Sequence, residues 1–182
     1  WRLNSDEITE EELTTALAQK EILRALKMIN DPTGHIHIHA KESAFKVWKE
    51  KGIRIPNFQV INKKQEITLE FPYLIRLNNQ VTGKDSFLVK NEEELNNSWP
   101  ILWSSYRESV KTKPFTKIIA VEFIDATKES GKYNLSYRII VSGNKVITGY
   151  ARLSEATDWV AITGKFKKSM GNLFLKYQER CN

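Results

Sequence analysis

The sequence contains one cysteine, Cys181, so no disulfide bond can form within the chain. It also lacks any apolar run close to the roughly 20 residues that a transmembrane helix needs, and no signal peptide is visible. A lone cysteine is typical of a reducing compartment. Together these absences predict a cytoplasmic protein with no membrane-spanning segment.

The excess of positive charge is small. Lysine and arginine number 28 and aspartate and glutamate 22, which gives a net charge of +6. This excess is spread along the chain, apart from Lys165, Lys167 and Lys168 near its end. Spread positive charge usually serves solubility, so a nucleic-acid partner is not expected. A basic α+β domain that binds RNA is kept as a third interpretation, which a flat salt dependence of binding would exclude.

Glycine is sparse, at eight residues, and no glycine-rich nucleotide motif is present. Three Gly-Lys pairs occur, but none has the preceding glycine or the following serine or threonine of a P-loop. The pairs are Gly83-Lys84, Gly131-Lys132 and Gly164-Lys165. Gly143 and Gly149 form no dinucleotide-binding fingerprint, and the absence of a nucleophile elbow gives no support to a serine or cysteine hydrolase.

Hydrophobic periodicity predicts helices mixed with short strands. Helices are expected from Thr9 to about Met28, from Lys41 to Lys51, from Asn91 through Tyr106, and over the stripe from Phe166 to Tyr177. Strands are expected over Ile53 to Ile61, Ile67 to Leu77, Ser86 to Lys90 and Ile118 to Val121, and in a hairpin of Tyr133 to Val141 and Lys145 to Arg152. Residues 153–163 are expected to be irregular. This mixture indicates the α+β class.

Two prolines are expected to disturb these elements. Pro72 predicts that its strand is either an edge strand or bent at its start. Pro100 predicts a kink, or a restart of the helix capped by Ser98. Helical spacing predicts which aromatic side chains are buried: Phe45 and Trp48 in one helix, and Trp99, Trp103 and Tyr106 in the next. Stacking of the latter three on nucleic-acid bases is the weaker alternative.

The predicted hairpin carries an arginine among apolar neighbours. Alternation places Leu135, Tyr137, Ile139 and Val141 on one face of the first arm and Arg138 on the other. A cation on an otherwise apolar strand is costly without a partner. We therefore expect Arg138 to meet an anion, which is either a protein carboxylate or a ligand phosphate.

Three histidines, His35, His37 and His39, alternate with isoleucines, so on a strand their imidazoles would share one face. Imidazole nitrogens are zinc ligands, and such a site can leave a coordination position open. No fourth ligand or supporting carboxylate can be assigned nearby. A solvated edge strand is therefore the preferred interpretation, and a metal site is the alternative.

Between about Asn30 and Trp159, a series of short segments occurs in a particular order. These are Asn30-Asp31-Pro32; Ala40-Lys41-Glu42; Lys51 to Pro56; Phe71 to Arg76; Thr82 to Asp85 with Phe87 to Lys90; Val121 to Asp125; and Tyr137 to Val141 with Gly143 to Val146. The ordered set resembles the ATP-grasp superfamily, in its glutathione-synthetase-like branch. The resemblance implies an α+β fold of two small α/β subdomains with antiparallel sheets, with the C-terminal part of the fold missing. It divides the chain into an N-terminal helix and linker (1–34), a first subdomain (35–115) and an incomplete second one (116–182).

The same resemblance implies an ATP-binding module of a ligase that activates a carboxylate as an acyl phosphate for attack by an amine. Its partners would be a nucleotide and a carboxylate-bearing substrate, and it implies no oligomeric state. Arg138 is the expected catalytic residue. The expected nucleotide contacts are Lys41, Arg76, Gly83, Lys84, Glu122, Phe123, Ile124, Asp125 and Arg152.

These residue types suit the chemistry. Cations that converge from different elements can neutralise separate parts of a triphosphate, and the turn around Gly83 could offer backbone amides to the phosphates. The segment after Val121 could pair adenine with its backbone while Phe123 or Ile124 packs the ring. For Arg76, the alternative is a salt bridge with Glu70 or Asp85.

The chain also departs from the family pattern. Arg76 stands where the family most often has lysine, although arginine still binds phosphate bidentately. The loop after it has one glycine, Gly83, where the family's mobile loop is glycine-rich. The family's magnesium ligands, an aspartate and a glutamate-x-asparagine pair, lie on late strands, and the chain ends at Asn182 before any such strands. No metal ligand is therefore assigned, and Mg²⁺ is expected only if the chain continues beyond Asn182. The alternative function is a non-catalytic module that kept the fold and lost these ligands.

Overall fold

The computed structural model describes residues 10–22, 40–80, 83–125, 127, 133–142 and 145–155. All structural statements below concern these residues. The chain divides into two compact units, Trp1–Phe123 and Ile124–Asn182, which are described separately. Among the described residues, no helix is long and apolar enough to cross a membrane.

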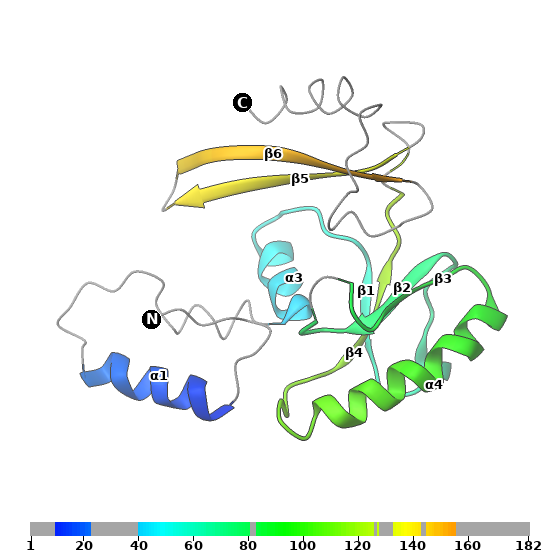
Figure 1. Cartoon of the computed structure of the whole chain (residues 1–182), viewed down its shortest axis with the longest axis horizontal. Helices are drawn as coiled ribbons and strands as arrows, with labels where there is room; N and C mark the ends of the chain where they lie inside the picture. Colours follow the sequence, from blue (N-terminus) through cyan, green and yellow to red (C-terminus); the bar gives the residue numbers. More distant parts are fainter. Residues whose placement is uncertain are drawn as a thin grey trace. The chain divides into compact units, whose positions relative to one another are not determined.

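The first unit is built on a four-stranded antiparallel sheet (Figure 1). Its strands are β1 (Phe58–Ile61), β2 (Tyr73–Leu77), β3 (Ser86–Val89) and β4 (Ile118–Glu122), in the order β1-β4-β2-β3. Because β4 pairs with both β1 and β2, it belongs to this sheet, and the division into compact units falls after it rather than at residue 115.

One face of this sheet carries the hydrophobic core. Alternation along β2 buries Tyr73, Ile75 and Leu77 and leaves the residues between them half-buried. The core cluster also includes Ile61, Val89, Leu95, Leu102, Ile118 and Ala120. Burying a side chain of the size of leucine or isoleucine contributes about 1.5–3 kcal/mol. This face therefore holds the unit together, and the intervening side chains of β2 are left for the opposite face.

Helix α4 (Glu92–Ser109) covers the core face (Figure 1). Asn91 caps it, since its side chain accepts a hydrogen bond from the Glu94 amide at 2.9 Å, as its position predicts. The helix continues through Pro100 without a break, so the expected restart at Ser98 is wrong. Trp99 and Tyr106 pack against the core as predicted, but Trp103 is 37% exposed and stacks on Trp99 instead.

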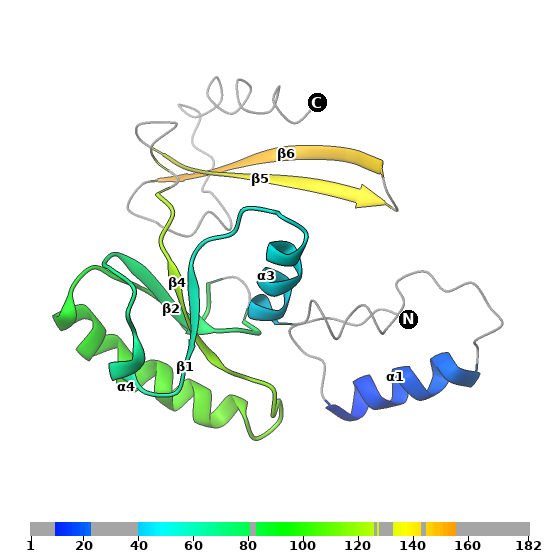
Figure 2. The ribbon, with the colours of Figure 1, turned by 180° about the vertical axis from the view of Figure 1, so that it is seen from behind.

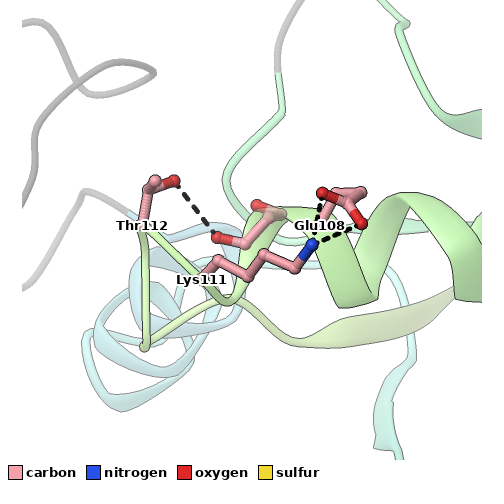
Figure 3. A network of polar contacts seen from close by, with 4 residues as sticks. Glu108, Lys111 and Thr112 are labelled. Atoms are coloured by element: carbon pink, nitrogen blue, oxygen red, sulfur yellow. Dashed lines mark hydrogen bonds and ion pairs between the residues drawn. The ribbon is translucent and has the colours of Figure 1, made fainter.

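The end of α4 carries a small surface network (Figure 3). The ammonium group of Lys111 lies 2.7 Å from Oε1 of Glu108, and the Thr112 hydroxyl donates to the carbonyl of Ser109. Both charged side chains are largely exposed, at 64% and 71%. Exposed pairs of this kind contribute about 0–1 kcal/mol, so this network is not a major source of stability.

Helix α3 (Lys41–Glu50) ends as the sequence predicts. Gly52 follows it with a φ of 74°, and the Gly52 amide donates to the carbonyl of Lys49. Phe45 lies against Phe58 of β1, with ring centroids 5.2 Å apart. Trp48 was expected to be buried, but it is 45% exposed. The buried residue of this helix is Glu42.

Strand β2 lies inside the sheet, so its interpretation as an edge strand is wrong. Pro72 instead stands at a bend just before the strand begins, which is the alternative that the sequence offered. Helix α1 (Glu10–Ile22) and the one-turn η1 (Lys64–Glu66) complete the described elements of this unit. The expected ends of the first helix, at Thr9 and near Met28, lie outside the described residues, as do the three histidines.

The second unit contains the predicted hairpin, β5 (Tyr133–Ser142) and β6 (Lys145–Glu155), drawn side by side in Figure 2. The two strands pair along their whole length, with a register shift between Ile140 and Val141. Strand β6 continues to Glu155. The expectation of irregular structure is therefore wrong for residues 153–155. Residues 143–144 and the helix expected from Phe166 to Tyr177 lie outside the description. Helices and antiparallel sheets together confirm the α+β class.

Candidate functional site

Two cations that are far apart in the sequence meet at one end of the first sheet. The guanidinium of Arg76 donates from Nη2 to the carbonyl oxygen of Gln80 at 2.6 Å. The ammonium group of Lys41 donates to the same oxygen at 2.5 Å. These are the two residues that the sequence assigned to phosphate binding on a helix start and a strand end. The structure brings them together on one backbone carbonyl.

Arg76 owes its position to strand alternation. Its neighbours Ile75 and Leu77 are fully buried in the core, so the arginine side chain projects from the opposite face of the sheet. There it is half-buried, and its Nε has no hydrogen-bond partner among the described residues. Burial lowers the pKa of its guanidinium, because a charge loses hydration there. The expected alternative, a salt bridge with Glu70 or Asp85, is not formed in the described part of the chain. Arg76 is therefore a partly desolvated cation with a donor to spare.

Lys41 is the first residue of α3, and the end of β2 holds it. Its backbone amide donates to the carbonyl of Asn78 at 3.1 Å, and its Nζ reaches the same oxygen at 3.4 Å. The residue before it, Ala40, provides no side-chain cap. The carbonyl of Asn78 thus satisfies one of the amides at the helix start that have no partner within the helix.

A polar cluster that the sequence analysis missed lies beneath these cations. Glu42, Asn78, Asn79 and Thr116 are all at most 3% exposed. Asn78 donates through Nδ2 to Oε1 of Glu42 at 3.0 Å and accepts at Oδ1 from the Lys117 amide at 2.9 Å. A pair of asparagines directly after a buried strand was the available signal, because most buried polar groups have at least one hydrogen-bond partner in the fold.

The loop after β2 carries two more predicted residues. Gly83 has a φ of 76° and Asp85 a φ of 47°, so the chain turns sharply here. Lys84 is exposed. Asp85 accepts a hydrogen bond from the Ser105 hydroxyl at 3.1 Å, which ties the loop to α4. Between them lies a polar cavity of about 410 Å³ lined in part by Gln80, Lys84 and Asp85.

The predicted adenine-binding segment begins at the end of β4. The amide of Glu122 donates to the carbonyl of Asn57 at 2.8 Å, and that of Phe123 to the carbonyl of Pro72 at 3.4 Å. The Glu122 carboxylate accepts from the Asn57 amide at 2.9 Å. These two amides and this carboxylate oxygen are thus bonded within the protein. An adenine base placed here would contact the side chain of Phe123, which is half-buried. It would not meet a free amide at Glu122 or Phe123, because both amides already donate within the protein.

The remaining predicted residues belong to the second unit. Ile124 is 63% exposed. Asp125 accepts at Oδ1 from the amide and hydroxyl of Thr127, at 2.9 and 2.6 Å. Arg138 lies opposite Tyr150 in the hairpin and Arg152 opposite Ser136. Their side chains lie outside the description, so their assigned roles stay predictions.

Comparison with solved structures shows that the chain has a known fold. The chain superposes on an L-amino acid ligase from Bacillus licheniformis with a TM-score of 0.58 and 16% identity, covering 90% of this chain and 39% of that one. It also matches a carboxyaminoimidazole ribonucleotide synthase from Aspergillus clavatus, solved in complex with ATP, with a TM-score of 0.55 and 11% identity over 91% of this chain and 42% of that one. The fold is ATP-grasp-like. The chain therefore spans about two fifths of the length of these structures. No family model and no curated protein matches its sequence.

The residues present fit a phosphate group in this ATP-grasp-like fold. Phosphate oxygens are strong acceptors for guanidinium and ammonium groups, and the buried Nε of Arg76 has no partner among the described residues. The two donor nitrogens lie 2.5 and 2.6 Å from the same oxygen, so they are at most about 5 Å apart. Like charges this close repel each other, and an anion beside them would offset the repulsion. For Mg²⁺ the fit is different: the described residues contain no group of three or more histidine, cysteine or acidic side chains that could hold a metal ion.

Proposed function

We propose that the chain is an ATP-binding module of an ATP-grasp-type ligase. In such an enzyme ATP activates a carboxylate as an acyl phosphate, and an amine then attacks it. Both neighbours with the higher similarity are named as a ligase or a synthase, and one was solved with ATP. Because the fold alone is shared at this identity, the activity, the carboxylate substrate and the cytoplasmic location are all part of the proposal.

The observation that carries the proposal is the convergence of Lys41 and Arg76 on the carbonyl of Gln80. They reach it from a helix start and from near the end of a strand. Phosphoryl transfer depends mainly on such positioned positive charge. Within the first unit, Lys41 and Arg76 would hold the phosphates, and the turn at Gly83 would offer its amides. Phe123 would pack the base.

The family resemblance implies further roles for four residues of the second unit, and we keep these as proposals. We assign the catalytic role to Arg138, which would stabilise the negative charge of the transferring phosphoryl group. Ile124, Asp125 and Arg152 would line the nucleotide, as the family resemblance implies. The phosphates of ATP would be neutralised by these cations. Mg²⁺ would need carboxylate ligands, and the described residues contain no group that could hold it.

A non-catalytic nucleotide-binding module is the second candidate. It is favoured by the absence of an acidic cluster among the described residues, since a metal that bridges the phosphates needs such ligands. Both candidates require ATP binding. They differ in whether the protein turns over a substrate. The chain matches about two fifths of each neighbour, so this difference concerns residues that the match does not include.

The test is ATP binding by isothermal calorimetry. Arg76→Ala and Lys41→Ala should each weaken binding by about tenfold or more, as loss of a charged hydrogen bond costs about 1.5–3 kcal/mol. The matched controls are Arg107→Ala on α4 and Lys111→Ala in the turn after it, which remove the same charges from positions that do not contact the Gln80 carbonyl and should change affinity by less than about twofold. If all four variants bind ATP as the wild type does, or the wild type does not bind it, the proposal is wrong.

A further inference from the structure

A cluster of buried polar residues lies at the end of β2. Four polar residues, Glu42, Asn78, Asn79 and Thr116, lie in the interior with exposed fractions of 1%, 0%, 2% and 3%. Apolar residues of similar size would avoid the cost of removing these groups from water. Such a cluster is therefore a candidate for holding something in position.

Asn78 is the centre of this cluster. Its backbone amide donates to the carbonyl of Lys117 at 2.9 Å, and its side-chain oxygen accepts from the Lys117 amide. Its Nδ2 donates both to Glu42, at 3.0 Å, and to the carbonyl of Phe115, at 3.2 Å. Its own carbonyl accepts from Lys41. One side chain thus joins the start of α3, the end of β2 and the start of β4.

Glu42 connects this centre to α3. Its Oε1 accepts from Asn78 and lies 3.3 Å from the ammonium group of Lys117. Because Glu42 is the residue directly after Lys41, its side chain anchors the first turn of the helix at one point while the Lys41 backbone anchors it at another. Two anchors on consecutive residues fix both the position and the rotation of the helix start. They thereby direct the Lys41 ammonium group to the Gln80 carbonyl, beside Arg76.

We propose that Asn78 and Glu42 are positioning residues, which hold Lys41 in place for the phosphate groups of the nucleotide. This inference rests on the proposed function and goes beyond it. Neither residue touches the phosphates; both act through Lys41. A lysine that the fold already holds in place binds an anion more tightly than a mobile lysine. The entropy cost of ordering its side chain is met on folding rather than on binding.

Asn79 provides a matched control, because it is the same residue type, next in sequence and equally buried. Its Nδ2 donates to the Thr116 hydroxyl at 2.9 Å, and Thr116 in turn contacts Ser109 at the end of α4. This branch of the cluster leads away from α3. Loss of the Asn79 side chain should therefore lower stability without moving Lys41.

The experiment compares ATP with adenosine, which lacks the phosphates, using the full chain. Calorimetry measures ATP, and ligand-observed NMR measures adenosine. Asn78→Ser and Glu42→Asp keep the net charge but shorten the side chains that hold the start of α3. Each should weaken ATP binding about tenfold and adenosine binding less than about twofold. Asn79→Ser should leave the ratio of the two affinities at its wild-type value while it lowers the unfolding temperature.

The outcomes separate the two proposals. A wild-type chain that fails to bind ATP overturns the proposed function. A wild-type chain that binds ATP, with an unchanged affinity ratio in both Asn78→Ser and Glu42→Asp, overturns the positioning role alone. An equal fall of the ratio in Asn79→Ser also overturns it, because the effect would then follow from lost stability. If Asn78→Ser does not fold, Glu42→Asp decides the question, since it retains the buried carboxylate.

Discussion

Single residues in this protein differ sharply in how far the sequence predicts their environment. Alternation along β2 places Arg76 and the core residues beside it on opposite faces of the sheet. Helical spacing predicts the buried side of α4, yet Trp103 lies at the margin of that side and is 37% exposed. Glu42 is the reverse case, because nothing in its local sequence indicates that a first-turn glutamate is 1% exposed. Periodicity shows on which face of an element a side chain lies, whereas its exposed fraction depends on the elements that pack against that face.

Tyr73 makes a testable prediction at this scale. Burial, followed by the nearby charge of Glu92, raises its pKa to about 12. An acid with a raised pKa in the folded state is stabilising below its unfolded pKa of about 10, and this stabilisation is lost as the pH rises through the folded value. Between about pH 9 and pH 11, the wild type should therefore lose more unfolding free energy than Tyr73→Phe. Urea denaturation of both proteins at several pH values measures this difference, and parallel curves would contradict it.

Whole elements were predicted better than their ends. The sequence indicated α3 and α4, the four strands of the first sheet and the hairpin. The first two strands proved shorter than expected, since β1 begins at Phe58 rather than at Ile53 and β2 at Tyr73 rather than at Ile67, whereas the hairpin strands extend slightly further than expected. Caps were the most reliable boundary signals, because Asn91 and Gly52 act through local geometry that needs no tertiary contact. Pro100 did not produce the restart that the sequence offered as one alternative, since the helix continues through it.

The cap of α4 makes a prediction at the scale of the element. Asn91→Ala removes the acceptor of the Glu94 amide and should lower the free energy of unfolding by about 1 kcal/mol. Asn97→Ala, at an exposed position within the same helix, is the control. It should be neutral or slightly stabilising, because alanine is the better helix former. Equal destabilisation by both changes in urea denaturation would show that the cap contributes nothing.

At the scale of the molecule, the two units are built differently. The first has a covered sheet with a continuous core. The described part of the second is a two-stranded sheet, and several of its apolar side chains are exposed, including Ile139 at 50% and Val146 at 63%. A two-stranded sheet alone is marginally stable in water. We therefore expect the two units to open with different free energies.

Hydrogen exchange tests this difference. Amides of β4, which lies between β1 and β2, should exchange at least about tenfold more slowly than those of β5 and β6, which have one neighbouring strand each in the described structure. Mass spectrometry of peptides covering residues 118–122 and 133–155 gives both rates. Equal protection would mean that the hairpin is covered as fully as the first sheet.

The sequence by itself determined the kinds of element, their order and the α+β class, because periodicity, caps and turns are local properties of the chain. It also singled out Lys41 and Arg76 as candidate phosphate ligands. Only the tertiary structure decided that both meet the carbonyl of Gln80, which is 39 residues from Lys41. It alone revealed the buried contacts of Asn78 and Glu42. Those contacts depend on how a helix start, a strand end and a second strand come together, and no local pattern encodes that meeting.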